Sequence, residues 1–101
     1  MDNGIIAETE HIDKTISAFA GRLEEYVTSM REELDALTRS VSRLGDAWVS
    51  DDYELFRDTM RAKTDKIRAE LVKANDLKTY LDETAEQFRT VLALLREGAE
   101  K

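Results

Sequence analysis

The sequence has 101 residues, of which 37% are charged and 42% hydrophobic, with four glycines, no proline and no cysteine. This length predicts one domain, and this composition is typical of long helices or coiled coils rather than of sheets or disordered tails. The net charge of −7 disfavours nucleic acid and anionic membranes as partners, and the absence of cysteine excludes disulfides and thiolate chemistry.

The first residues, MDNGIIAETEHIDK, lack both the basic segment and the apolar core of a standard secretory signal peptide. We therefore expect no cleaved signal peptide. No apolar run in the sequence is long enough to span a bilayer, so we also expect no transmembrane segment.

Apolar residues recur at seven-residue intervals in the first half, and this pattern predicts a helix over about 9–45. The two main rows are Ile16, Leu23, Met30, Leu37 and Leu44, and Ala20, Val27, Leu34, Val41 and Trp48. A third row of Ile12, Phe19 and Tyr26 ends at Glu33, so the apolar face is broadest in its N-terminal half. Gly45 is the expected C-terminal stop of this helix.

The second half repeats the pattern and predicts a helix over about 51–97. Its strict row is Tyr53, Met60, Ile67, Ala74, Leu81, Phe88 and Leu95, flanked by Leu71, Ala85 and Leu92 on one side and by Phe56, Leu77 and Val91 on the other. Polar residues interrupt the stripe at Lys63, Thr64, Glu70 and Lys78. Ser50 or Asp51 can cap this helix, and Asp51 with Glu54 has the spacing of a capping box.

A turn over about 46–50 between two long helices predicts an all-α fold, a single antiparallel helical-hairpin domain over residues 1–101. Each helix of a lone hairpin has one neighbour, which cannot cover the broad ends of both stripes. We therefore expect the hairpin to pair into a four-helix bundle. The residues expected at the partner interface are Ile12, Phe19, Tyr26, Leu81, Phe88 and Leu92.

The hairpin and its turn resemble the Trp-x-Gly helical-hairpin family of type VII secretion systems, the relatives of the early secreted antigenic target. Members have about this length, and their turn carries Trp-x-Gly with a leucine four residues before the tryptophan and an aromatic residue eight after it. Leu44, Trp48 and Phe56 stand at those positions here. The resemblance covers nearly the whole chain and implies that the turn forms part of a surface read by the secretion machinery.

The chain departs from the family pattern at two places. Ser50 replaces the glycine, giving Trp-Val-Ser. Serine lacks the freedom of glycine to adopt a positive φ, but it supplies an oxygen that can cap a helix. Many exported members also carry Tyr-x-x-x-Asp/Glu after the second helix, whereas Tyr80 here is followed four residues later by Thr84. The resemblance thus implies a cytoplasmic protein that is secreted without a cleaved signal, with the export signal supplied by a partner.

Trp48 has two interpretations. It continues the row of Val41 and so caps the hydrophobic seam, or it presents an edge for recognition, and a tryptophan can do both.

The residues that could carry chemistry have simpler explanations. Glu8-x-x-His11 has the spacing of di-iron bundles, but those sites need the motif twice, and this chain has one histidine. The oxygen-rich turn of Asp46, Ser50, Asp51, Asp52 and Glu54 lacks the regular spacing and the central glycine of a calcium loop. The acid pairs Glu24-Glu25, Glu32-Glu33 and Asp82-Glu83 splay apart on a helix. We expect no metal, no cofactor and no enzymatic activity.

Arg57, Arg61 and Arg68 fall on one face of the second helix. Glu54 and Asp65 share that face, which favours a solvated or partner-facing salt-bridge surface over a nucleic-acid site.

Two functions follow from these observations. The first is a small type VII secretion protein that pairs with itself, with a related small helical protein or with the N-terminal helical region of a toxin, and helps present that partner for export. The secretion ATPase is then an indirect partner. The second is a cytoplasmic coiled-coil scaffold or chaperone-like module without a role in secretion.

Overall fold

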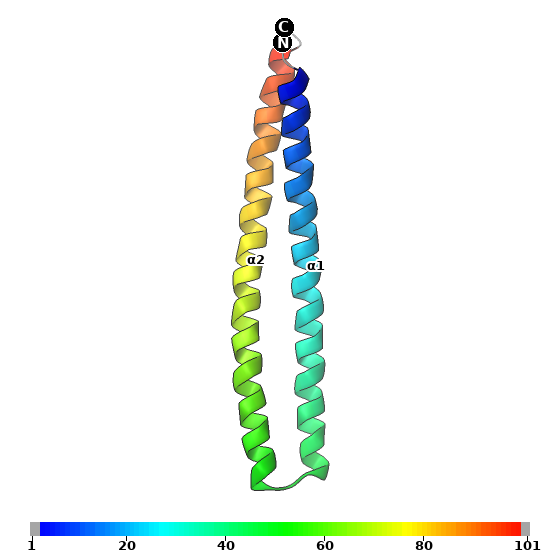
Figure 1. Ribbon diagram of the computed structural model, residues 1–101, viewed down its shortest axis with the longest axis vertical. Coiled ribbons are helices and arrows are strands. Elements are labelled where there is room, and N and C mark those ends of the chain that lie inside the picture. The colour runs from blue at the N-terminus through cyan, green and yellow to red at the C-terminus, as the bar shows by residue number, and fades with distance from the viewer. Residues whose placement is uncertain (1–2, 100–101) are drawn as a thin grey trace. The chain divides into compact units, whose positions relative to one another are not determined.

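The computed structural model describes residues 3–99 and contains two helices, α1 (Asn3–Ala47) and α2 (Asp51–Ala99), joined by residues 48–50 (Figure 1). No strand occurs in this part of the chain. The predicted all-α helical hairpin is confirmed. Neither described helix includes a stretch that is apolar enough to act as a membrane span.

The helices extend beyond the predicted bounds, most clearly at the start of α1. This helix begins at Asn3 instead of residue 9. Ile6 is half-buried and Thr9 is buried, so the three–four spacing of the seam runs further toward the N-terminus than the predicted apolar rows, which begin at Ile12. The hydroxyl of Thr9 is satisfied locally, because it donates to the Ile5 carbonyl oxygen at 2.7 Å. A polar residue can therefore occupy the seam without leaving a buried donor unpaired.

The chain divides into two compact units, each of which pairs a segment of α1 with a segment of α2. We call residues 3–24 and 75–99 the terminal unit, and residues 25–74 the turn unit. Within the terminal unit, the blue start of α1 lies beside the orange end of α2 (Figure 1).

The core of the turn unit comes from the predicted rows. Val27, Leu34 and Leu71 are 1%, 4% and 3% exposed, and Met30 and Ala74 pack against them. In the terminal unit the most deeply buried apolar residues are Ala20, Ala85 and Leu92. Each unit therefore has a narrow seam with one layer of buried side chains, as expected for two helices packed through a heptad stripe.

Candidate functional site

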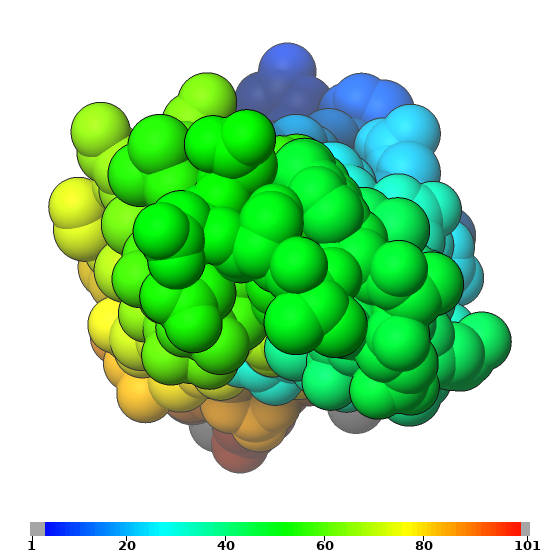
Figure 2. All heavy atoms as spheres, turned by 90° about the horizontal axis from the view of Figure 1, so that it is seen from below, coloured from blue at the N-terminus to red at the C-terminus, as the bar shows by residue number. Residues whose placement is uncertain are grey.

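The turn carries a cluster of three aromatic residues. The ring centroid of Trp48 lies 5.7 Å from that of Tyr53, with an interplanar angle of 62°, and 5.9 Å from that of Phe56, at 38°. Tyr53 is 8% exposed, whereas Trp48 and Phe56 are 37% and 36% exposed. The cluster is thus anchored by Tyr53 and leaves the edges of the other two rings accessible. Seen from below, the green turn residues gather into one continuous surface (Figure 2).

Backbone hydrogen bonds fix the path of the turn. The Trp48 amide donates to the Leu44 carbonyl oxygen at 2.9 Å, which continues the helical pattern of α1 up to the connection. Ser50 caps α2, because its Oγ accepts the Tyr53 amide at 3.2 Å and its carbonyl oxygen accepts the Glu54 amide at 3.3 Å. Ser50 therefore stabilises the start of α2. Asp51 lies inside the helix, so the expected capping box of Asp51 and Glu54 does not form.

Gly45 has a different role from the predicted one. The helix α1 continues through it to Ala47, and no described glycine has a positive φ, so the prediction of a C-terminal stop at Gly45 is wrong. Instead, the ring of Tyr53 lies against it: a Cβ added at Gly45 would stand 2.6 Å from Tyr53 Cζ and from its hydroxyl oxygen. The same hydroxyl donates to the Val41 carbonyl oxygen at 2.7 Å. Gly45 is needed because Tyr53 crosses from α2 onto the backbone of α1.

This contact predicts that the same substitution has opposite effects at two glycines. Gly45→Ala should destabilise the hairpin by about 1–3 kcal/mol, because the added methyl displaces the Tyr53 ring and its hydrogen bond to Val41. Gly21→Ala should stabilise it by about 0.5–1 kcal/mol, since nothing lies within 4 Å of that added Cβ and alanine is the better helix former. Urea unfolding of both variants measures the difference. Stabilisation by Gly45→Ala of the same size as by Gly21→Ala would contradict the role assigned to Tyr53.

In the terminal unit, one side of the seam is bridged by charged residues, which we call the charged flank. Arg89 Nε lies 3.2 Å from Asp13 Oδ1, and Arg89 also donates to Ser17 Oγ at 3.3 Å. Arg96 pairs with Glu10. These contacts are partly exposed, so each contributes at most about 1 kcal/mol, and their main effect is to fix which residues of α1 and α2 stand opposite each other.

Lys78 explains one polar interruption of the apolar stripe. Its ammonium lies 2.6 Å from Asp82 Oδ2 on the same helix and 3.7 Å from Glu24 Oε2 on α1. The side chain thus extends past the edge of the seam and places its charge between two carboxylates. The hydrogen bond to Asp82 is the main reason why the pKa of Lys78 is raised above its ordinary value. This stabilising contribution is therefore complete at neutral pH and is lost only as the pH rises through the raised pKa.

The other side of the seam in the terminal unit is apolar, and we call it the apolar flank. On α1, Ile5, Ile12 and Phe19 each stand one residue before a position of the seam. The charged-flank residues Glu10 and Ser17 each stand four residues after such a position. At 100° per residue these rows lie on opposite sides of the seam. Because ion pairs join the charged rows of the two helices, the rows on the other side also face each other across the seam.

On α2 the apolar flank continues with Leu77 and Val91, which likewise precede seam positions by one residue. Tyr80 and Leu94 follow them by three residues and widen the same face. The exposed fractions of these seven side chains are Ile5 47%, Ile12 40%, Phe19 49%, Leu77 46%, Tyr80 63%, Val91 48% and Leu94 63%. The terminal unit is therefore charged and bridged on one flank, and apolar and open on the other.

No protein-family model, curated protein or solved structure matches this chain. The function proposed below therefore rests on the arrangement of the side chains in this chain.

The structure distributes the predicted partner-facing residues between two environments. Ile12, Phe19 and Tyr26 are exposed on α1, with fractions of 40%, 49% and 55%, whereas Leu81 and Phe88 are half-buried and Leu92 is 6% exposed. The α2 side of the open face is formed instead by Leu77, Tyr80, Val91 and Leu94. The sequence signal for this exposed face of α2 was a repeat of fourteen residues, which separates Leu77 from Val91 and Tyr80 from Leu94.

Of the predicted turn motif, the structure brings Trp48 against Phe56 and joins Leu44 to Trp48 through the backbone, with Leu44 42% exposed. Ser50 lies beside them as the cap of α2. The prediction omitted Tyr53, although it begins the strict row of the second helix. Its importance depends on the close approach to Gly45, which the sequence pattern does not reveal.

The acidic residues do not gather around a common point. Within residues 3–99, no three or more His, Asp or Glu side chains form a group that could hold a metal ion. Glu8 and His11 are exposed near the start of α1. Asp51, Asp52 and Glu54 occupy the first turn of α2, where carboxylates interact favourably with the positive end of the helix dipole.

Proposed function

We propose that the hairpin is a pairing protein, which associates through its apolar flank with a second helical hairpin to form a four-helix bundle. The partner is a second copy of the chain, a related small helical protein or the N-terminal helical region of a toxin. The observation that carries this proposal is the contrast between the two flanks of the terminal unit. The charged flank already satisfies its residues within one chain, whereas the apolar flank has seven half-exposed large side chains.

The apolar flank is large enough to drive association. Completing the burial of a half-exposed Ile, Leu, Val, Phe or Tyr side chain contributes about 1 kcal/mol, so the seven side chains together contribute about 7 kcal/mol per chain. A symmetric pair buries both faces and so doubles this contribution, to about 14 kcal/mol, which is comparable to the estimated cost of association of about 4–15 kcal/mol. Further contacts at the rim then determine the affinity.

The proposed biological role of the pair is to present its partner for export through a type VII secretion system. Support comes from the turn, where Trp48 stands with Leu44 and Phe56 at the family spacing and remains 37% exposed while it contacts Tyr53. In this role the chain is cytoplasmic before export and reaches the secretion ATPase through its partner. Ser50 stands where the family has glycine, and its capping bonds to α2 support a turn of fixed shape.

Trp48→Ala separates recognition from folding. Most helicity should remain, because the seam residues of both units are unchanged, and the local loss should be at most a few kcal/mol. Export of the pair should fall much more than its formation, since the exposed edge of the aromatic cluster is removed. The measurement compares secreted with cell-associated protein, alongside a pull-down of the partner. Val49→Ala is the matched control, because Val49 is 89% exposed and should affect neither quantity.

If Trp48→Ala pairs normally and is exported at the wild-type level, Trp48 acts only in packing. The cytoplasmic scaffold then becomes the better account of the hairpin.

A further inference from the structure

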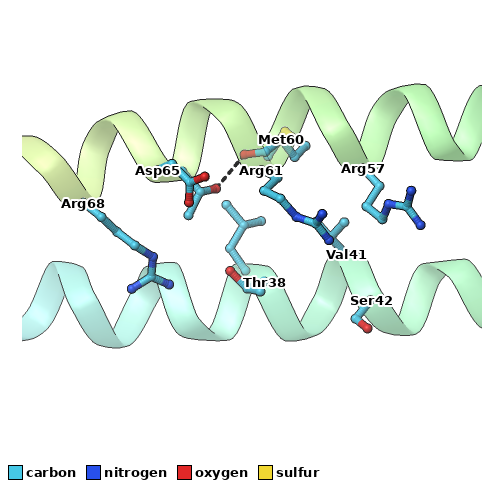
Figure 3. Close-up of a pocket in the computed structure, with 10 residues that line it drawn as sticks. Thr38, Val41, Ser42, Arg57, Met60, Arg61, Asp65 and Arg68 are labelled. Atoms are coloured by element: carbon cyan, nitrogen blue, oxygen red, sulfur yellow. Dashed lines mark hydrogen bonds between the residues drawn. The ribbon is translucent and has the colours of Figure 1, made fainter.

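The turn unit contains a second surface, a groove of about 290 Å³ between α1 and α2. Its floor is formed by Leu37, Val41, Met60 and the buried Thr64, and its rim is formed by Thr38, Ser42, Arg57, Arg61, Asp65 and Arg68. Arg57, Arg61 and Arg68 all extend from α2 toward α1 (Figure 3). The apolar flank lies in the terminal unit, so the two surfaces are made of different residues.

The lining of the groove is rich in arginine, although the chain has a net charge of −7 and two of these arginines are ion-paired to neighbouring carboxylates. Three arginines and a single carboxylate, that of Asp65, line it. At physiological salt, charges interact over about 8 Å, so a ligand in the groove responds to these residues more than to the net charge.

The arginines are incompletely paired. Arg68 Nη2 lies 2.8 Å from Asp35 Oδ1, and Arg57 Nε lies 3.2 Å from Oδ1 of the adjacent Asp58. Within residues 3–99, no carboxylate pairs with Arg61. The α1 side of the groove carries the hydroxyls of Thr38 and Ser42, and the Thr38 hydroxyl donates to the Leu34 carbonyl oxygen at 2.9 Å. Arg68 meets a carboxylate on α1, as Arg89 and Arg96 do in the terminal unit, whereas within the described residues Arg57 and Arg61 do not.

We propose that this groove binds an acidic helical segment of a partner protein, with one large apolar side chain on the floor and carboxylates one helical turn to either side. The carboxylates pair with Arg61 and with the free donors of Arg57 and Arg68, since each guanidinium offers five donors and one carboxylate occupies two of them. Arg61 and Arg68 are seven residues apart on α2, or ~10.5 Å, which is about two turns of the partner helix and so matches carboxylates one turn to either side of the apolar side chain.

The apolar floor and the arginines of the rim together favour an acidic helix over a nucleic acid as the ligand. An apolar floor favours a side chain such as leucine, which a phosphate backbone does not offer. The carboxylates of Asp65, Asp35 and Asp58 in and beside the groove repel a densely charged nucleic acid more than a helix with a few spaced carboxylates. The inference rests on the proposed function only in that the hairpin acts by binding other helices.

The test uses a fluorescent synthetic helical peptide of about 18 residues, with one leucine between glutamates placed one turn before and one turn after it. The matched peptide has every glutamate replaced by glutamine. Fluorescence anisotropy of the full chain should show at least about tenfold tighter binding of the acidic peptide. In NMR spectra, the perturbed backbone amides should be those of residues 37–42 and 57–68.

Arg61→Gln should weaken binding of the acidic peptide at least about tenfold, and Arg61→Lys should lose less, because it keeps the charge. Arg39→Gln is the matched control, since Arg39 is exposed on α1 outside the groove and its loss should leave binding unchanged. Circular dichroism verifies that each variant is folded.

Three results would overturn the proposal: equal affinity for both peptides, equal weakening by Arg61→Gln and Arg39→Gln, or tighter binding of a single-stranded oligonucleotide of the same charge. Pairing through the apolar flank is measured separately by molar mass. Failure of the groove therefore leaves the proposed function standing, and failure of pairing leaves the groove testable.

Discussion

Leu34→Asp is expected to unfold the turn unit. Leu34 is 4% exposed and belongs to the core cluster with Val27 and Leu71. A carboxylate at this position has no cationic partner in the seam, and an uncompensated buried charge costs several kcal/mol, which is comparable to the whole stability of a small domain. Circular dichroism should therefore show loss of the cooperative thermal transition.

Ala36→Asp is the matched control for Leu34→Asp. Ala36 is exposed on the same helix two residues away, so the added charge remains in water and the expected loss is below about 1 kcal/mol. If the two variants melted alike, the assigned heptad register of α1 would be wrong.

Phe19→Lys is expected to abolish pairing while the hairpin remains helical. Phe19 is 49% exposed in the single chain and is the largest side chain of the α1 row of the apolar flank, which it forms with Ile5 and Ile12. The substitution removes a large aromatic contact, worth about 2 kcal/mol or more at the centre of an interface, and adds a charge that pairing must desolvate. Together these effects weaken association at least about a hundredfold.

Ala18→Lys introduces the same charge at the adjacent, exposed position, which points away from the seam. Analytical ultracentrifugation of the two variants distinguishes the faces: only Phe19→Lys should sediment as a monomer. Loss of pairing in both variants would mean that total charge, not the apolar flank, controls association.

The heptad rows alone were sufficient to predict the hairpin and its core. Val27 and Leu34 on α1 and Leu71 on α2 lie on predicted rows and form the buried core cluster of the turn unit. Sequence periodicity succeeds here because two long helices without proline bury the central residues of their apolar stripes against each other. The start of α1 was predicted too late because the apolar rows begin at Ile12, whereas the seam continues through the polar Thr9 to Ile6.

The candidate sites were only partly predictable. Gly45 was interpreted from its usual conformational role, but its function depends on the Tyr53 ring, which approaches it from the other helix. Likewise, the sequence placed Leu92 at the partner surface, and which side of the α2 stripe is open became clear only once the ion pairs of Arg89 and Arg96 had fixed the orientation of the rows. Such contacts across the seam are not encoded in the periodicity of either helix.

The central claim, that the apolar flank is the pairing surface, is tested most directly by the solvent accessibility of single methyl groups in the paired state. NMR relaxation by a soluble paramagnetic agent reports this for Ile12 and Val91, which lie on the apolar flank, with the 89% exposed Val49 as the reference. We expect the methyl groups of Ile12 and Val91 to become protected as the pair forms, while those of Val49 remain accessible. A pair in which Ile12 and Val91 stay as accessible as Val49 would contradict the account.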